Sequence, residues 1–201
     1  MKDWKKIVLP ELMQEHCKLD QRGLPIPFVV FIDQDNQSHF KVNDITKTNI
    51  CISEDRCSIC GQVMGEDKWM IGGPRSALHK SGAYIDTPVH KVCGQYALEV
   101  CPYLAYSGYT AKTDIEKLQK KIAGNVLLSD NTVDQNRVPL FVFAKTSKIE
   151  VDLISKYVYP VRPFLNMEYW NDGEQLNEVE ALTILNNYSK QYYNTYGTNY
   201  L

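Results

Sequence analysis

A long apolar run is missing from the first part of this 201-residue chain. The N-terminal sequence MKDWKKIVLPELMQEH is interrupted by Pro10 and Glu11 before any extended hydrophobic segment develops. A signal-peptide core needs about 7 to 15 apolar residues, and a membrane-spanning helix needs about 20. We therefore expect a cytoplasmic protein that has no membrane partner.

An excess of charge of one sign is also missing. The chain has 22 basic and 24 acidic residues, which give a formal net charge of -2. Because no global positive field is present to attract nucleic acid, the charge balance argues against a general DNA-coating protein. With 44% hydrophobic and 23% charged residues, the composition is that of an ordinary globular protein, and the length favours one compact domain.

Six cysteines are present, and their spacing is the most informative pattern in the chain. In a reducing cytosol, thiols are available for metal binding or catalysis rather than for disulfides. Cys57 and Cys60 form a CxxC pair followed by Gly61, and His90 and Cys93 follow about thirty residues later. The first pair can direct two thiolates at one ion, because glycine tolerates the left-handed conformation that such a tight turn needs.

The second pair of candidate ligands is expected at the start of a helix. Thr87 is predicted as the N-cap and Pro88 as the first helical residue, where its missing N–H is not needed. His90 and Cys93 are three residues apart and would then share one helix face. The helix N-terminus would favour the anionic thiolate of Cys93.

The order of elements predicts an α+β fold in which a treble-clef-like zinc module is embedded in a small mixed domain. Between the two ligand pairs, residues 68–71 and 83–85 favour a β-hairpin, so that knuckle, hairpin and ligand-bearing helix follow in treble-clef order. The module spans residues 51–106. A segment with a β-hairpin (residues 1–50) precedes it, and an α+β part (residues 107–201) packs on it.

Periodicity and turn signals predict the remaining elements. Strands are expected at residues 28–32, 39–42, 139–144, 157–161 and 164–170, with a hairpin turn at 171–173. Capping-box patterns predict helices at residues 113–124 and from near Asn177. Residues 43–54 are ambiguous and could hold a helical turn or two, residues 125–137 read as a polar loop, and residues 192–201 read as a frayed end.

Three thiolates and one imidazole suit tetrahedral Zn²⁺, and four protein ligands leave no open position for water. We therefore predict a structural Zn²⁺ site at Cys57, Cys60, His90 and Cys93, with no catalytic residues. The alternative is that these cysteines are buried and reduced without metal. His79 could replace His90 only if the predicted helix start is misplaced.

The other three cysteines are expected to be reduced thiols that do not bind the metal. Cys101 lies eight residues beyond Cys93, about two helical turns along, which is too far to share the ion. It is expected to be a core residue just before Pro102 ends the helix. Cys17 and Cys51 carry no spacing signal.

Several short motifs resemble those of a family of small proteins of unassigned function from phages, prophages and bacterial genomes. The family pattern is CxxCG, a segment ending in Gly-Pro, PxHxxC, Tyr-Ala and CPxL. Its counterparts here are Cys57 to Gly61, Met70 to Pro74, Pro88 to Cys93, Tyr96-Ala97 and Cys101 to Leu104. Arg75 and the additional Gly73 depart from the pattern. The resemblance implies a zinc module and a phage-related origin, with the host cytoplasm as location, but no substrate.

The charge of the predicted zinc module and the motifs it lacks indicate which functions to expect. Residues 51–101 hold five basic and six acidic residues, whereas a nucleic-acid reader normally shows a positive excess. A zinc deaminase is excluded because no His-x-Glu precedes Cys57. The leading hypothesis is a non-catalytic, zinc-stabilised binding protein of phage or prophage origin that engages a host or phage macromolecule, either protein or nucleic acid.

Two alternatives remain open. The loop from Gly72 to Lys80, with its exposed glycine backbone and a local basic patch, could bind a nucleotide or another anion. The candidate residues are Gly73, Arg75, His79, Lys80 and Lys91. The alternative without a ligand is a solvated hairpin with ordinary surface charges. A zinc-stabilised nuclease would need a general base, for which His79 and Asp86 are the nearby candidates.

Overall fold

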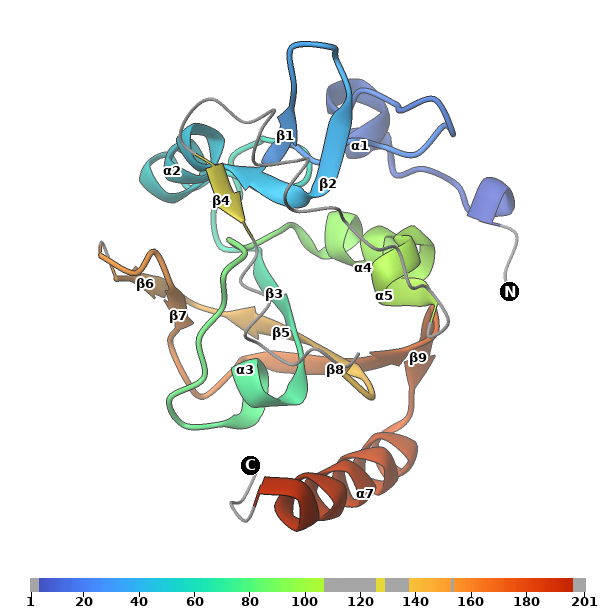
Figure 1. Cartoon of the computed structure of the whole chain (residues 1–201), viewed down its shortest axis with the longest axis vertical. Helices are drawn as coiled ribbons and strands as arrows, with labels where there is room; N and C mark the ends of the chain where they lie inside the picture. Colours follow the sequence, from blue (N-terminus) through green and yellow to red (C-terminus); the bar gives the residue numbers. More distant parts are fainter. Residues whose placement is uncertain (1–3, 107–125, 129–137, 153, 197–201) are drawn as a thin grey trace.

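The computed structural model describes residues 4–106, 126–128, 138–152 and 154–196 (Figure 1). The helices are η1 (Trp4–Lys6), α1 (Glu11–His16), α2 (Ile45–Ser53), α3 (Pro74–Leu78), α4 (Lys91–Val100), α5 (Pro102–Ala105) and α7 (Glu178–Tyr196). The strands are β1 (Val30–Ile32), β2 (Ser38–Asp44), β3 (Lys68–Gly72), β4 (Val126–Leu128), β5 (Phe141–Thr146), β6 (Ile149–Val151), β7 (Val158–Pro160), β8 (Asn166–Asn171) and β9 (Glu174–Leu176). Helices and antiparallel sheets together confirm the predicted α+β class.

A four-stranded antiparallel sheet in the order β3-β5-β8-β9 forms the centre of the molecule. β5 lies between β3 and β8, and nearly all of its residues are buried, as its apolar sequence predicts. β3 and β5 pair in register from Lys68–Thr146 to Gly72–Val142, although residues 73–140 separate them in the chain.

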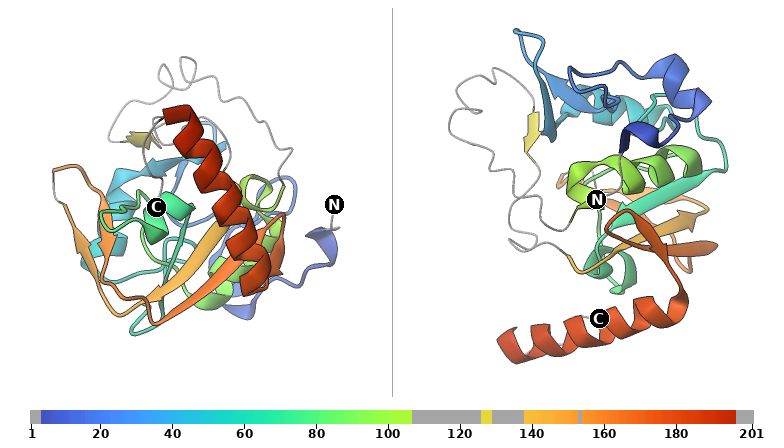
Figure 2. Two further views of the ribbon diagram at one scale, coloured as in Figure 1. Left: turned by 90° about the horizontal axis from the view of Figure 1, so that it is seen from below. Right: turned by 90° about the vertical axis from the view of Figure 1, so that its right-hand side faces the viewer.

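Each face of this sheet contributes to its own hydrophobic core, because side chains alternate along a strand. Trp69, Phe141, Phe143 and Trp170 point to the face that α4 covers. Met70, Val142 and Ala144 belong to the opposite core, which includes Ala181 and Leu185 of α7. Figure 2 shows α4 and α7 on opposite sides of the sheet.

The N-terminal part contains the predicted hairpin, in which β1 pairs with β2. The ambiguous stretch after it is a nine-residue helix, α2, because the Asp44 side chain accepts hydrogen bonds from the amides of Thr46 and Lys47 at 2.9 and 3.3 Å. β4 adds to β2, so the prediction of a polar loop through residues 125–137 is wrong at Val126–Leu128.

The C-terminal elements follow their local signals. Asp172 and Gly173 have φ values of 48° and 76°, as the predicted tight turn between β8 and β9 requires. Asn177 and Glu180 exchange two hydrogen bonds of 3.0 Å between side chains and amides, which confirms the capping box at the start of α7. The three-residue strand β6 was not predicted from the sequence, and β9 was implied only by the predicted hairpin turn at residues 171–173.

Other predictions are wrong or untested. The hairpin of residues 68–71 with 83–85 does not form: β3 pairs with β5, and Tyr84 bridges to Val158 instead. The predicted helix at residues 113–124 lies outside the described residues, as does the end of the chain beyond residue 196. α7 continues through residues 192–196, which were expected to be frayed. Within the part of the chain that is described, no helix combines the length and apolar character needed to cross a membrane.

Candidate metal centre

The first ligand pair lies on a tight knuckle between Arg56 and Val63, which form an antiparallel bridge. The Gly61 amide donates to the Cys57 carbonyl at 2.8 Å, and Gly61 has a φ of 74°. A Cβ at this position would lie 2.8 Å from the Phe28 ring. Glycine is therefore required at this turn both for its left-handed backbone and for its small size.

The second ligand pair is placed differently from the prediction, because α4 begins at Lys91 with His90 as its N-cap residue. Thr87 is not the N-cap: it lies outside any helix, and Val89 after it exchanges backbone hydrogen bonds of 2.8 and 3.0 Å with Trp69. Pro88 therefore precedes the helix rather than starting it.

The Lys91 amide at the start of α4 is satisfied from outside the helix. Asp67 accepts the Lys91 amide at 3.0 Å through one carboxylate oxygen and the Trp69 indole N–H at 2.8 Å through the other. A carboxylate there also complements the positive end of the helix dipole. Asp67 thus fixes the position of the helix that carries Cys93.

The structure brings the four predicted ligands together. Side-chain ligand atoms of Cys57, Cys60, His90 and Cys93 all lie within 4.8 Å of one another. The three cysteines are buried and His90 is half-buried. Zinc bonds of about 2.3 Å to sulfur and 2.0–2.1 Å to nitrogen give tetrahedral edges of roughly 3.5–3.8 Å. The cluster therefore fits one tetrahedral ion after small adjustments.

Hydrogen bonds around the cluster orient its ligand atoms. The amides of Ile59 and His90 each donate to the Cys57 sulfur at 3.4 Å. His90 Nε2 lies 3.1 Å from the Val63 carbonyl, so Nε2 carries the proton and Nδ1 is free to bind a metal. Nδ1 lies 3.3 Å from the Cys60 sulfur, on the side of the thiols. This is the outer-shell arrangement expected around a metal-bound imidazole.

Charge also favours a cation in this cluster. Hydrogen bonds from the Cys57 and Cys93 thiols lower the pKa of Cys60 to about 3. The contacts with Cys57 and Cys60, together with burial, raise the pKa of Cys93. One thiolate therefore makes a second one unfavourable, and a divalent cation is the group that allows all three to deprotonate together.

Close packing holds α4 against the sheet. A Cβ on Gly94 would lie 2.4 Å from the Phe143 ring and 2.9 Å from a Val89 methyl. Phe143 is fully buried, and its ring centroid lies 4.6 Å from that of Trp69, with the two ring planes inclined by 34°. Because Gly94 directly follows Cys93, this contact sets how deeply the fourth ligand sits in the core.

The three remaining cysteines are outside the four-ligand cluster. Cys51 is buried in α2, and burial together with the nearby Cys57 raises its pKa to about 12. Cys101 ends α4, and burial raises its pKa as well. Cys17 is half-buried, and its thiol donates to the Ile59 carbonyl at 3.5 Å.

The residues of the predicted anion loop are not a single cluster of free charges. Arg75 and Lys80 are exposed on and just after α3, and His79 Nδ1 accepts hydrogen bonds from the amide and hydroxyl of Ser81 at 3.3 and 2.9 Å. Gly73 packs near Val138, which a Cβ would meet at 2.7 Å. Anion binding at this loop stays a prediction.

Lys91 serves a network that the sequence did not indicate. Its ammonium lies 3.0 Å from Glu168 on β8 and 4.9 Å from the centre of the Trp69 ring. Glu168 is 92% buried and also accepts hydrogen bonds from Gln95 at 3.1 Å and Trp170 at 3.2 Å. The alternation of side chains along a strand could have indicated this network, because Glu168 stands two residues before Trp170 and so points into the same core.

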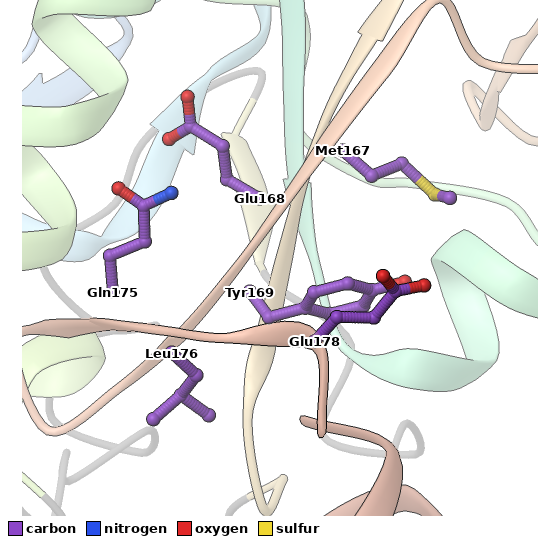
Figure 3. Close-up of a pocket in the computed structure, with 6 residues that line it drawn as sticks. All are labelled: Met167, Glu168, Tyr169, Gln175, Leu176 and Glu178. Atoms are coloured by element: carbon purple, nitrogen blue, oxygen red, sulfur yellow. The ribbon is translucent and has the colours of Figure 1, made fainter. Parts of the chain in front are cut away.

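A shallow cavity of about 260 Å³ lies beside this network, at the end of β9. Figure 3 shows Glu168 and Gln175 on one side of β8, and Met167 and Tyr169 on the other. Leu176 and Glu178 complete its lining. None of these residues is a ligand of the candidate metal centre.

Asp86 and His79, the candidate bases of a nuclease, have separate partners. Asp86 accepts a hydrogen bond from the Asn43 amide group at 2.9 Å, whereas His79 is hydrogen-bonded to Ser81. No protein-family model matches the chain, and neither a curated protein nor a solved structure matches it. The resemblance to the phage and prophage family therefore stays a prediction.

Proposed function

We propose that this protein is a zinc-stabilised binding protein whose metal centre has a structural rather than a catalytic role. The observation that carries the proposal is the cluster of Cys57, Cys60, His90 and Cys93, whose ligand atoms lie within 4.8 Å of one another. Three sulfurs and one imidazole nitrogen complete a tetrahedral shell and leave no position for a reactive water. The soft thiolate donors favour Zn²⁺ over Mg²⁺ or Ca²⁺.

The position of the centre supports a structural role. It joins the knuckle to α4, and its cysteines belong to the same hydrophobic core as Trp69, Phe143 and Trp170 of the sheet. Zinc at sites of this kind contributes on the order of 10 kcal/mol to folding. The metal would then be a requirement for the folded state rather than an accessory to it.

The binding role concerns a host or phage macromolecule. The near balance of charge in residues 51–101 favours a partner recognised by more than phosphate attraction. Val63 on the knuckle and Val92 on α4 are 59% and 47% exposed, which gives the module apolar contact points. The motif resemblance adds a phage or prophage origin to the proposal.

Metal content and folding test the zinc centre. We expect about one zinc per chain by elemental analysis of protein purified without added metal. Cys60→Ser and Cys93→Ser should lose zinc and dispersed amide NMR signals, whereas Cys101→Ser, which changes a thiol outside the cluster, should keep both. Purified protein without zinc that still gives a dispersed spectrum would overturn the proposal.

Catalytic assays test the absence of metal-site chemistry. Zinc-loaded protein incubated with DNA or RNA and added Mg²⁺ or Mn²⁺ should leave the nucleic acid intact. Cleavage that is abolished by His79→Ala but retained by Ser81→Ala would show a nuclease and would refute the binding role. Captured partners can then be compared between wild type and a Val63→Ser, Val92→Ser variant that retains zinc.

A further inference from the structure

A fifth sulfur, that of Cys17, lies against the candidate metal centre. The Cys17 thiol donates to the Ile59 carbonyl at 3.5 Å, and the Ile59 amide in turn donates to the Cys57 sulfur at 3.4 Å. Cys17 packs on the core cluster that contains Cys57, Cys60 and Cys93. Two sulfurs from distant parts of the chain therefore bind the backbone of the same knuckle residue.

This contact limits the distance between Cys17 and Cys60. A carbonyl oxygen lies about 2.8 Å from the next Cα, so the Cys17 sulfur is at most about 6.3 Å from the Cα of Cys60. In a disulfide, each sulfur lies roughly 4 Å from the partner's Cα. Bond formation therefore requires the Cys17 sulfur to approach Cys60 by up to about 2 Å.

The chain around Cys17 is suited to such a displacement. α1 has only six residues, Pro10 provides no side-chain cap, and Cys17 is the residue that ends the helix. Helices this short have little stability of their own. Cys17 is also half-buried, whereas the neighbouring thiol of Cys51 is only 2% exposed, so Cys17 is the better placed of the two to move.

We propose that Cys17 is a resolving thiol that makes the zinc centre a reversible redox switch, an inference that rests on the proposed zinc site. The oxidant is hydrogen peroxide. The Cys60 thiolate attacks one peroxide oxygen, the O–O bond breaks, and Cys60 sulfenic acid and hydroxide form. The Cys17 sulfur then attacks the Cys60 sulfur, the S–O bond breaks, and the thiol proton leaves with the hydroxyl group as water.

The product is a Cys17–Cys60 disulfide, and the two electrons have reduced the peroxide. Only Cys57, His90 and Cys93 would then remain to hold a Zn²⁺ ion, and loss of one thiolate would weaken binding enough for a competing chelator to remove the ion. Trapping Cys60 as a disulfide also protects it from irreversible oxidation to the sulfinic acid. A dithiol reductant with Zn²⁺ then restores the centre.

The experiment compares wild type, Cys17→Ser and Cys101→Ser. The serine hydroxyl at position 17 can still donate to the Ile59 carbonyl, so the fold is retained, and Cys101→Ser controls for loss of a thiol elsewhere. Zinc content is measured first in all three proteins. Hydrogen peroxide is then added with a metallochromic indicator, and the peptides are mapped by mass spectrometry before and after reduction.

We expect wild type and Cys101→Ser to release zinc, to yield a Cys17–Cys60 linked peptide and to regain zinc after reduction. Cys17→Ser should yield no such peptide and should accumulate sulfinic acid at Cys60, with loss of zinc re-uptake. Equal recovery in wild type and Cys17→Ser, or a wild-type map without the Cys17–Cys60 link, overturns the switch. Absence of zinc before peroxide is added instead refutes the proposed function.

Discussion

Replacing Gly94 with alanine tests the close contact between α4 and the sheet. In an isolated helix, alanine is more favourable than glycine by about 1 kcal/mol. Here the added Cβ would meet the Phe143 ring at 2.4 and 2.5 Å and a Val89 methyl at 2.9 Å, far inside the usual carbon–carbon separation of about 3.5–4.0 Å. Phe143 is fully buried and has no solvent-facing space to enter.

Overpacking of a well-filled core costs about 1–3 kcal/mol. The short distances place Gly94→Ala at the upper end, so subtracting the gain in helix propensity leaves a net destabilisation of about 2 kcal/mol. The assay is urea unfolding at a fixed free zinc concentration, because a metal bound at the proposed site would contribute to the stability of the folded state. A variant that is more stable than wild type by about 1 kcal/mol, as propensity alone predicts, would refute the reasoning.

A second substitution isolates the contact. As a single substitution, Phe143→Leu should destabilise the protein by about 1–1.5 kcal/mol. It also removes the ring atoms that the Cβ of Gly94→Ala would touch. The double variant should therefore be more stable than the sum of the two single effects by about 1–2 kcal/mol. Gly94 is helical and has no left-handed φ, so the loss of stability comes from the Cβ contacts and not from backbone strain.

The remaining predictions concern two carboxylates. Asp67→Ala should lower the unfolding free energy by about 1 kcal/mol, because the Lys91 amide at the start of α4 loses its acceptor; Glu66→Ala, an exposed neighbour, should change it little, and equal effects of the two would contradict the capping role. The hydrogen bond from His39, together with the one from the Gln37 amide, lowers the pKa of Asp33. The contribution of the Asp33 carboxylate to the unfolding free energy is therefore complete above the ordinary Asp pKa of about 3.9, and it is lost as the pH falls through the lower pKa of the folded state. The difference in unfolding free energy between wild type and Asp33→Asn should therefore shrink below that pH, and a difference independent of pH would show that Asp33 does not act through its charge.

The cluster of candidate metal ligands could be predicted because spacing along the chain carries most of the information. Cys57 and Cys60 lie within one knuckle. Cys93 comes three residues after His90, the N-cap residue of α4, so both side chains lie at the start of that helix. The start of α4 could not be predicted, because it depends on Asp67 and on the pairing of Val89 with a strand twenty residues earlier.

Elements specified by neighbouring residues were predicted, and elements specified by distant ones were not. The turn at Asp172-Gly173 and the capping box of Asn177 and Glu180 are local, and both are confirmed. The partner of β3 is β5, far along the chain, so the expectation of a local hairpin was wrong. The Lys91–Glu168 pair likewise exists only because β8 lies beneath α4.

The order of strands in the sheet also has a consequence for synthesis on the ribosome. The segment with all four candidate ligands, from Cys57 to Cys93, is complete before any residue of β5 has been made. Domains begin to form from the N-terminal side during synthesis, and closing this shorter loop is favoured over closing the one between β3 and β5. Metal binding would then hold Trp69 of β3 to Val89 while the other edge of β3, and the apolar face of α4, still await the strand that carries Phe143. In this interval the bound ion would hold β3 and α4 together until β5 has been synthesised and can complete the hydrophobic core. Zinc supply during translation should therefore limit the yield of native protein.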